Sequence, residues 1–128
     1  MRLLLDTHVL LWAAAQPEQL SPAARALLED EDNALVFSAA SLWEITIKSD
    51  LGRRDFRVDP RLFRRALVDN GYLELPITNQ HVLALKGLAG HHKDPFDRML
   101  VAQSIAEGIV LVTTDPLVAQ YAGPIKQV

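Results

Sequence analysis

The 128-residue sequence contains no cysteine, which removes several kinds of chemistry from consideration. Disulfide bonds, thiolate nucleophiles and cysteine-ligated zinc or iron–sulfur sites all require that side chain. Long apolar runs are also missing, since none approaches the roughly 20 residues that a membrane-spanning helix needs. A chain of this kind fits an intracellular location, and we expect a cytoplasmic protein that makes no contact with membranes.

The first twelve residues, MRLLLDTHVLLW, are mostly apolar and superficially resemble a secretion signal. Asp6 and His8 interrupt that stretch, however, and no small-residue cleavage site follows a continuous apolar region. We interpret the segment as a strand that runs into a helix. The 49% hydrophobic and 23% charged residues are ordinary for a globular protein, so we expect a single domain over residues 1–128.

The net charge of −3 conceals a basic segment between Lys48 and Arg65. Its basic residues outnumber its acidic ones, and they are Lys48, Arg53, Arg54, Arg57, Arg61, Arg64 and Arg65 against Asp50, Asp55 and Asp59. Such a surplus of positive charge suits a phosphate backbone. A solvated helix face is the alternative interpretation of this segment.

Short apolar runs alternate with helical patterns along the chain, which predicts an α/β fold with a central, mainly parallel sheet flanked by helices. The predicted strands are 2–6, 34–37, 72–77, 109–114 and a short edge strand at 124–128. Capping residues followed by proline or apolar periodicity predict helices from Thr7, Ser21, Ser38, Asp59, Thr78, Asp94 and Asp115. In the helix after Thr78 we expect Val82, Leu85 and Leu88 to form the buried face.

Four acidic residues occupy unusual positions in this pattern. Asp6 and Asp115 directly follow the first and fourth strands, Glu44 lies about two turns into a helix, and Asp97 falls in the first turn of another. In a parallel sheet the strand ends and the following helix starts share one edge, where such folds place their sites. Taken singly, these acids also fit helix caps, a helix-starting acid and a Glu44–Lys48 pair.

Taken together, the four carboxylates predict a metal site. At a spacing of about 6 Å each pair repels by roughly 3 kcal/mol at an effective dielectric of about 20. Protons or cations must offset that repulsion, and oxygen ligands favour Mg²⁺, with Mn²⁺ as a substitute. A divalent ion in such a site activates water for in-line attack on phosphorus. The chemistry that this suggests is phosphodiester hydrolysis.

The sequence resembles the PIN-domain ribonucleases, specifically the VapC-type toxins of toxin–antitoxin pairs. The resemblance rests on four segments in the family's order and spacing: LLLDTHVLLW, SAASLWEITIKSDLGR, HHKDPFDRMLVAQSIAEG and LVTTD. It implies a PIN-like fold and an endoribonuclease whose catalytic, metal-binding acids are Asp6, Glu44, Asp97 and Asp115. It also implies an RNA substrate, a homodimer and a cognate antitoxin, with DNA bound only indirectly through that antitoxin.

Residues around the predicted acids have supporting roles in this interpretation. We expect Asp94 to cap its helix, and the hydroxyls at Thr7, Ser38, Thr113 and Thr114 either to hold an acid or water in place or to serve as ordinary caps. The loop with His91 and His92 should lie beside the site, touching RNA or ordering Asp94, rather than bind zinc. Arg98 fits an exposed helix arginine or a phosphate contact. We interpret Trp12 and Trp43 as core or dimer-interface residues rather than base-stacking platforms.

Two other classes of function remain open from the sequence. A different acidic-site α/β protein would be a phosphatase of the haloacid-dehalogenase type or a phosphoacceptor receiver domain. The first needs an aspartate two residues after Asp6, where His8 stands, and the second needs one after the strand YLELPI, which lacks it. In a non-enzymatic binding module, the acids would be caps and solvated charges.

Overall fold

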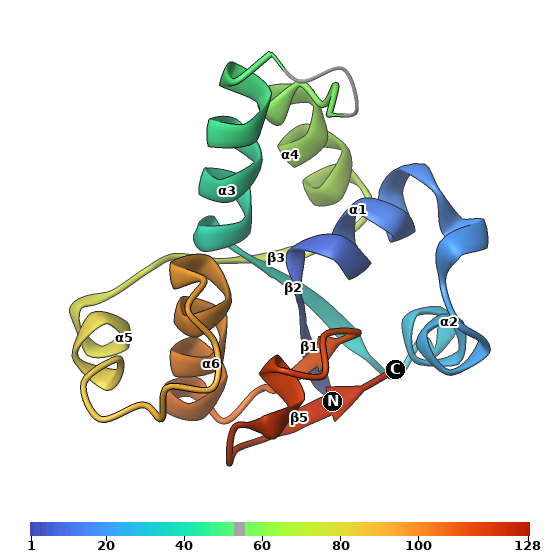
Figure 1. Ribbon diagram of the computed structural model, residues 1–128. Helices are drawn as coiled ribbons and strands as arrows, with labels where there is room; N and C mark the ends of the chain where they lie inside the picture. Colours follow the sequence, from blue (N-terminus) through green and yellow to red (C-terminus); the bar gives the residue numbers. More distant parts are fainter. Residues whose placement is uncertain (53–55) are drawn as a thin grey trace.

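The computed structural model describes residues 1–52 and 56–128 (Figure 1). A five-stranded sheet crosses the molecule, with every pair of neighbouring strands parallel and the order β3-β2-β1-β4-β5. Its strands are β1 (Arg2–Leu5), β2 (Ala34–Ser38), β3 (Leu73–Leu75), β4 (Val110–Thr113) and β5 (Ile125–Gln127). The predicted α/β fold with a parallel sheet is confirmed, including the edge strand near the C-terminus.

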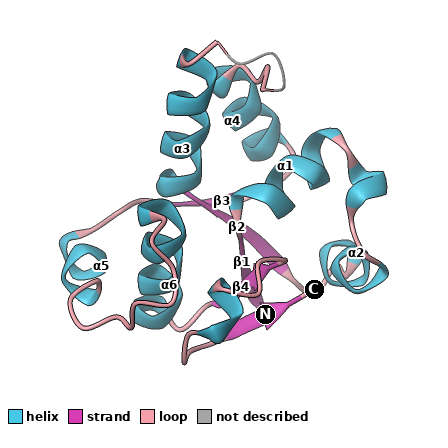
Figure 2. Cartoon of the chain, in the orientation of Figure 1, coloured by secondary structure: helices cyan, strands magenta, loops and turns pink. Residues whose placement is uncertain are grey.

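Helices connect the strands and cover both faces of the sheet (Figure 2). They are α1 (Thr7–Ala15), α2 (Pro22–Glu29), α3 (Ala39–Asp50), α4 (Pro60–Asp69), α5 (Asn79–Ala84) and α6 (Pro95–Glu107), with short 3-10 helices at Pro17–Gln19 and Val118–Gln120. In Figure 1, α5 and α6 lie on one side of the sheet and α1 and α2 on the other, while α3 and α4 project together beyond it. Among the described residues, no helix has the length and hydropathy to cross a bilayer.

Alternate side chains of β1 contribute to two separate hydrophobic cores. Leu3 and Leu5 pack with Val9, Phe37 and other residues on the α1 side, whereas Leu4 packs with residues of α6 on the opposite side. All three leucines are fully buried. Burial on both faces is what a central parallel strand requires, and it explains the uninterrupted apolar run at 3–5.

The order of the strands reverses between β1 and β4. After β1 the chain adds β2 and β3 on one side of it, then returns through α5 and α6 to place β4 on the other side. Parallel sheets bind ligands outside the carboxyl ends of the strands at such a reversal. Asp6 follows β1 and Asp115 follows β4 by two residues, so both stand at this position.

The predicted helix starts are confirmed where a side chain caps the helix. The side chains of Ser21, Ser38, Asp59, Thr78 and Asp94 all accept backbone N–H bonds from the first turns of their helices. At the other end of α6, Gly108 takes a left-handed conformation with φ 65°. Glycine adopts that conformation without the cost that a Cβ imposes, so its position explains why the helix ends there.

The prediction for the helix after Thr78 was wrong about its length and its buried face. Helix α5 ends at Ala84, and Val82 is 49% exposed, while His81 is fully buried. The imidazole of His81 is buried because polar partners surround it: Nδ1 accepts from the Thr78 N–H at 3.0 Å, and Nε2 contacts Glu107 at 2.8 Å. Leu85 and Leu88 do pack on the core, but from the turns that follow α5.

The short helix predicted from Asp115 is present only as a 3-10 helix, and it begins later than predicted. A turn follows Asp115, whose Oδ1 accepts the Leu117 N–H at 2.8 Å, and only the 3-10 turn Val118–Gln120 is helical. An aspartate that bonds the backbone two residues ahead favours a local turn over a continuing helix.

The neighbours His81 and Val82 provide a matched test of the α5 packing. We expect His81→Ala to lower the free energy of unfolding by roughly 2–4 kcal/mol, because it empties a buried volume and leaves polar groups unpaired. Val82→Ala should change it by less than about 0.5 kcal/mol, because Val82 is exposed. Urea unfolding measures both, and a larger loss for Val82→Ala would contradict the observed packing.

Candidate active site

Asp6 is held in a fixed orientation at the end of β1. Its side chain is buried, with Oδ1 accepting the Val9 N–H at 2.9 Å and Oδ2 accepting the Thr113 hydroxyl at 2.6 Å. Burial raises the pKa of Asp6, and the hydrogen bonds from Thr113 and Val9 oppose that rise without cancelling it. The predicted cap role of Asp6 is therefore real, but it uses only one of the two carboxylate oxygens.

Asp97 and Asp115 meet on either side of one imidazole. The Nε2 atom of His92 lies 3.0 Å from Asp97 Oδ2 and 3.0 Å from Asp115 Oδ2. One ligand atom from each of these three residues lies within 4.8 Å of the other two. Asp97 reaches this place from the first turn of α6, which Asp94 caps by accepting the N–H groups of Phe96 and Asp97.

Glu44 brings a buried carboxylate from α3. Its Oε2 accepts a bond from Lys48 Nζ at 2.6 Å, so the pair predicted from their spacing is present. Its Oε1 is buried and has no hydrogen-bond partner among the residues that the structure describes. Leaving a charged oxygen unpaired in the interior is costly, and a cation next to Oε1 would remove that cost.

The pKa of Asp97 reflects the negative charges of the neighbouring acids. The pKa of Asp97 rises from 3.8 to about 7, first because of burial and then because of the negative charges of Asp94, Glu44 and Asp6, while His92 opposes the rise. Asp6 and Asp115 stand at the strand-order reversal between β1 and β4, Asp97 joins Asp115 at His92, and Asp6 and Glu44 act on Asp97 through their charges.

His92 also belongs to this cluster, although the predicted ligand set contained only carboxylates. Its Nδ1 accepts the Asp94 N–H at 3.1 Å, which leaves the ring proton on Nε2, between the two carboxylates. His92 therefore donates to Asp97 and Asp115 and orders Asp94, as was predicted for the loop. Its position two residues before a helix-capping aspartate was the only local signal available.

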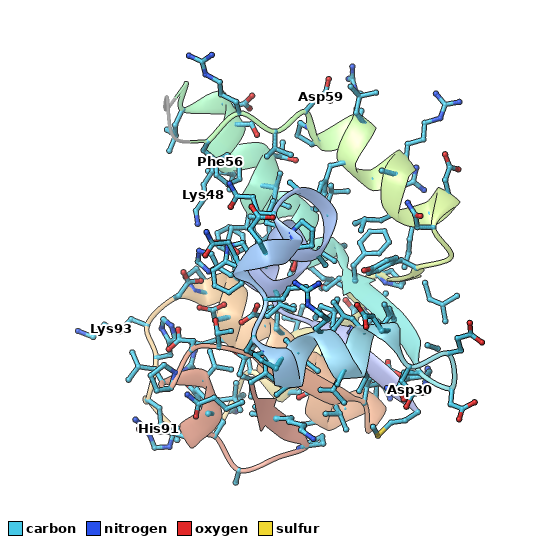
Figure 3. The ribbon with its side chains drawn as sticks, turned by 90° about the vertical axis from the view of Figure 1, so that its right-hand side faces the viewer. Asp30, Lys48, Phe56, Asp59, His91 and Lys93 are labelled. Carbon is cyan, nitrogen blue, oxygen red and sulfur yellow. The ribbon has the colours of Figure 1, made fainter. Side chains whose placement is uncertain are left out.

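Hydrogen bonds with Arg98 and Tyr121 hold the loop that contains His92 in place. Arg98 Nη1 donates to the Ala89 carbonyl at 2.9 Å and to the Tyr121 hydroxyl at 3.0 Å, and that hydroxyl accepts the His92 N–H at 3.1 Å. Arg98 is thus a half-buried structural residue, which corrects the expectation of an exposed arginine or a phosphate contact. In Figure 3, Lys93 of the same loop points away from the rest of the molecule.

The donor set fits a hard divalent cation. The carboxylates of Asp6, Glu44, Asp97 and Asp115 supply oxygen ligands, and the unpaired Oε1 of Glu44 supplies a buried negative charge that needs a partner. Mg²⁺ and Mn²⁺ prefer such ligands and complete their coordination with water and phosphate oxygens. These four residues could hold the ion, with Thr113 orienting Asp6 and His92 orienting Asp97 and Asp115.

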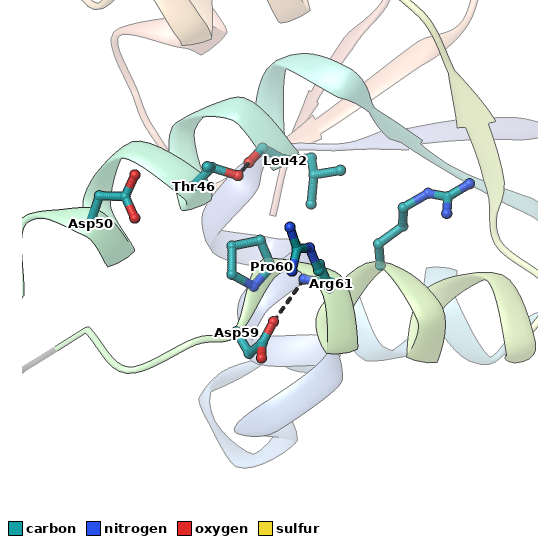
Figure 4. A pocket seen from close by; sticks show the side chains of 7 residues that line it. Leu42, Thr46, Asp50, Asp59, Pro60 and Arg61 are labelled. Carbon is teal, nitrogen blue, oxygen red and sulfur yellow. Dashed lines mark hydrogen bonds between the residues drawn. The ribbon is translucent and has the colours of Figure 1, made fainter.

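The basic segment divides into residues with different roles. Lys48 pairs with Glu44, and Arg64 Nη2 binds Glu74 Oε2 at 2.9 Å, while Arg53, Arg54 and Asp55 lie outside the described residues. A pocket of about 550 Å³ lies between α3 and α4. Figure 4 shows its lining side chains, among them Asp59, which accepts the Arg61 N–H. None of the four predicted acids lines this pocket, so the pocket is not part of the acidic site.

The two tryptophans differ from the prediction of core packing. Trp43 is 57% exposed and packs edge to face on Phe96, with ring centroids 5.0 Å apart. Trp12 is half-buried on α1 and lies 5.9 Å from the His8 ring. The core interpretation is therefore wrong for Trp43, and the dimer-interface interpretation stays a prediction.

Comparison with known proteins gives consistent matches along the whole chain. The PIN domain family model matches residues 3–124. Ribonuclease VapC22 of Mycobacterium tuberculosis is 27% identical over 121 residues, which cover 94% of this chain and 92% of that relative.

Solved structures share the fold at low sequence identity. A chain of VapBC2 from Rickettsia felis, crystallised with a DNA fragment from its promoter, aligns with a TM-score of 0.75 and 13% identity, covering 100% of this chain and 99% of that one. A chain of VapBC-5 from Mycobacterium tuberculosis aligns with a TM-score of 0.64 and 17% identity over 99% and 97% of the two chains.

The pKa of Asp97 predicts how the metal-free protein responds to pH. Because the folded-state pKa of about 7 exceeds the ordinary value of 3.8, the folded state binds this proton more tightly than the unfolded chain does. The resulting stabilisation is fully present below about pH 4 and is lost as the pH rises through 7. At about 1.4 kcal/mol per pKa unit, and discounted for a side chain that is 21% exposed, the loss is on the order of 2 kcal/mol.

Urea unfolding in EDTA at about pH 5 and pH 8 measures this loss. We expect Asp97→Asn to be more stable than the wild type at pH 8 and to show a smaller change between the two conditions. Asp69→Asn, which alters an exposed acid on α4, is the matched control and should leave the change intact. An identical pH response in the wild type and Asp97→Asn would show that Asp97 does not have the raised pKa.

Proposed function

Because the chain belongs to the PIN-domain family, we propose that it is a Mg²⁺- or Mn²⁺-dependent endoribonuclease that acts as the toxin of a type II toxin–antitoxin pair. The observation that carries this proposal is the acidic site at the strand-order reversal, where a raised pKa at Asp97 and an unpaired oxygen on Glu44 both call for a cation. The ribonuclease activity is supported by the likeness to VapC22, whose name records that activity.

The proposed reaction is the hydrolysis of an RNA phosphodiester bond. When bound, the metal ion supplies the positive charge that activates a water molecule and stabilises the leaving oxygen. The water oxygen forms a bond to phosphorus, the P–O3′ bond breaks, and O3′ leaves with a proton. The products are a 5′-phosphate and a 3′-hydroxyl, and no covalent enzyme intermediate is needed.

The protein side chains hold this site in place. Asp6, Glu44, Asp97 and Asp115 are the proposed metal ligands. Thr113 fixes Asp6 through a 2.6 Å hydrogen bond, and His92 bridges Asp97 and Asp115. Lys48 offsets part of the charge of Glu44 through its 2.6 Å bond to Oε2, which leaves Oε1 for the ion. Holding ligands in place before the ion binds is the usual contribution of such supporting residues.

The proposal includes partners as well as a substrate. Solved VapBC assemblies share the fold and pair a protein of this kind with an antitoxin, which supports an antitoxin partner here. We further propose a cytoplasmic homodimer that contacts DNA only through the antitoxin, and whose acidic site a basic antitoxin side chain would block. A single domain over residues 1–128 agrees with the family match over residues 3–124.

Cleavage assays with matched aspartate variants test the activity. We expect the wild type to cut RNA with Mg²⁺ or Mn²⁺ and to stop in EDTA, and Asp6→Asn and Asp97→Asn to lower the rate by about 10²–10³-fold, as loss of a key electrostatic group does. Asp69→Asn removes an exposed acid of the same type and should keep the wild-type rate. Full activity in EDTA together with full activity of Asp6→Asn would refute the proposal.

Calorimetry with Mn²⁺ provides a readout that is independent of RNA. The wild type and Asp69→Asn should bind the ion, whereas Asp97→Asn should bind it more weakly, because a ligand is lost. A protein that binds no Mn²⁺ and cuts no RNA would instead be the non-enzymatic binding module, in which the acids are caps and solvated charges.

The proposed biological role predicts a growth phenotype. Expression of the wild-type chain should arrest bacterial growth, while expression of Asp97→Asn at the same level should not. Co-expression of a small protein from a neighbouring open reading frame should relieve the arrest. Arrest by both chains would show that toxicity does not depend on the acidic site.

A further inference from the structure

A second pocket opens beside the acidic site, along α1. It has a volume of about 410 Å³ and lies between α1 and the segment that precedes α4; its lining includes His8, Leu11, Trp12, Phe56, Arg57 and Val58. His8 stands in the first turn of α1, two residues after Asp6, which caps that helix. The pocket therefore begins next to the acids. From His8 to Gln16 it follows α1 for about 12 Å, at about 1.5 Å per residue.

The side chains of this pocket combine aromatic faces with a positive charge. The rings of His8 and Trp12 are tilted by 42° with centroids 5.9 Å apart, so they do not stack on each other. Trp12 and Phe56 are each half-buried, and Phe56 also packs against the α1-side core, which holds its ring in place. Arg57 is exposed at the same pocket. Phe56 is labelled in Figure 3, where the α1 side of the molecule faces the viewer.

This combination matches the chemistry of unpaired nucleobases. Proteins bind single-stranded RNA by stacking bases on aromatic side chains and by placing arginine near the base planes and phosphates. A half-exposed indole is poorly suited to a hydrophobic core, because part of its apolar surface stays in water. The pocket between α3 and α4 has the charges of Arg61 and Arg64 but no aromatic lining residue, and its Arg64 is already bound to Glu74.

We propose that the pocket between α1 and the Phe56–Val58 segment binds an unpaired nucleobase of the RNA substrate, next to the phosphate that is cut. The inference rests on the proposed ribonuclease function and adds a binding subsite to it. Trp12 and Phe56 provide the stacking surfaces, and Arg57 faces the RNA backbone. This proposal replaces the expectation that Trp12 serves only in a core or a dimer interface.

A subsite of this kind selects unstacked RNA. A base inside a duplex cannot enter the pocket without losing its stacking and pairing. A base in a loop or a single strand is already unpaired, so its entry costs little free energy. The enzyme should therefore favour loops and single strands over duplexes. The distance along α1 allows one or two nucleotides between the acids and the far end of the pocket.

Tryptophan fluorescence identifies the ring that contacts RNA. The sequence has two tryptophans, so Trp43→Phe leaves Trp12 as the sole reporter, and Trp12→Phe leaves Trp43. Each is combined with Asp97→Asn and titrated in EDTA with an unstructured oligoribonucleotide of about eight nucleotides, a length within the usual range of single-strand sites. These conditions prevent cleavage and remove one repelling charge. We expect quenching of Trp12 and none of Trp43.

Affinity measurements in the same background test the individual contacts. Trp12→Ala should weaken binding by about 5- to 150-fold, which corresponds to the ~1–3 kcal/mol of one stacked base. Trp12→Phe should lose only a few-fold, because a ring remains. Arg57→Ala should weaken binding and lower the salt dependence by about one phosphate contact. Leu83→Ala, an exposed residue on α5, is the control and should bind normally.

Several outcomes would overturn the subsite. Three of them are quenching of Trp43 alone, quenching of neither ring, and equal affinity for duplex RNA. The fourth is Trp12 fluorescence that changes with protein concentration in the absence of RNA. That result would show that a second copy of the chain occupies the pocket. If Trp12→Ala fails to fold, Arg57→Ala and the fluorescence titration still decide. Binding in EDTA requires neither metal nor cleavage, so failure of the proposed ribonuclease activity would be seen separately.

Discussion

Repulsion between carboxylates that the fold brings together is the constraint on which the rest of the site depends. Asp97 experiences the charges of Glu44 and Asp6, and its pKa rises to about 7 because water is largely excluded. The surrounding hydrogen bonds reduce this cost but do not remove it: Thr113 serves one oxygen of Asp6, and Lys48 one oxygen of Glu44. The protein thus keeps a negative site that folding alone would disfavour, as sites shaped by function commonly do.

Those parts of the fold that are encoded in short stretches of sequence could be predicted. Capping serines and aspartates act within a few residues, so Ser38 and Asp94 identified the starts of α3 and α6 correctly. The apolar run at 3–5 predicted the first strand for the same reason, because adjacent residues alone carry that pattern. The positions of the acids after strands and in first helical turns depended only on this local order and on the geometry of parallel sheets.

Features that depend on distant partners could not be predicted in this way. His81 is buried because Glu107 and Thr78 meet its two ring nitrogens, and Glu107 is 26 positions away in the sequence. His92 joins the acids only because α6 and the end of β4 come together around it. Trp43 sits among aliphatic residues in the sequence, yet its neighbours in space leave it exposed, and helical spacing alone does not show which face a helix buries.

The hydrogen bond between Thr113 and Asp6 joins residues 107 positions apart, and this separation has a consequence for synthesis on the ribosome. Asp6 emerges first, but its partner arrives only when 107 further residues have been made, and β4 must then dock against β1. Contacts of such long range form late in folding. A nascent chain that ends before β4 would therefore lack the hydrogen bond that orients Asp6, and the four acids could come together only after translation has passed β4.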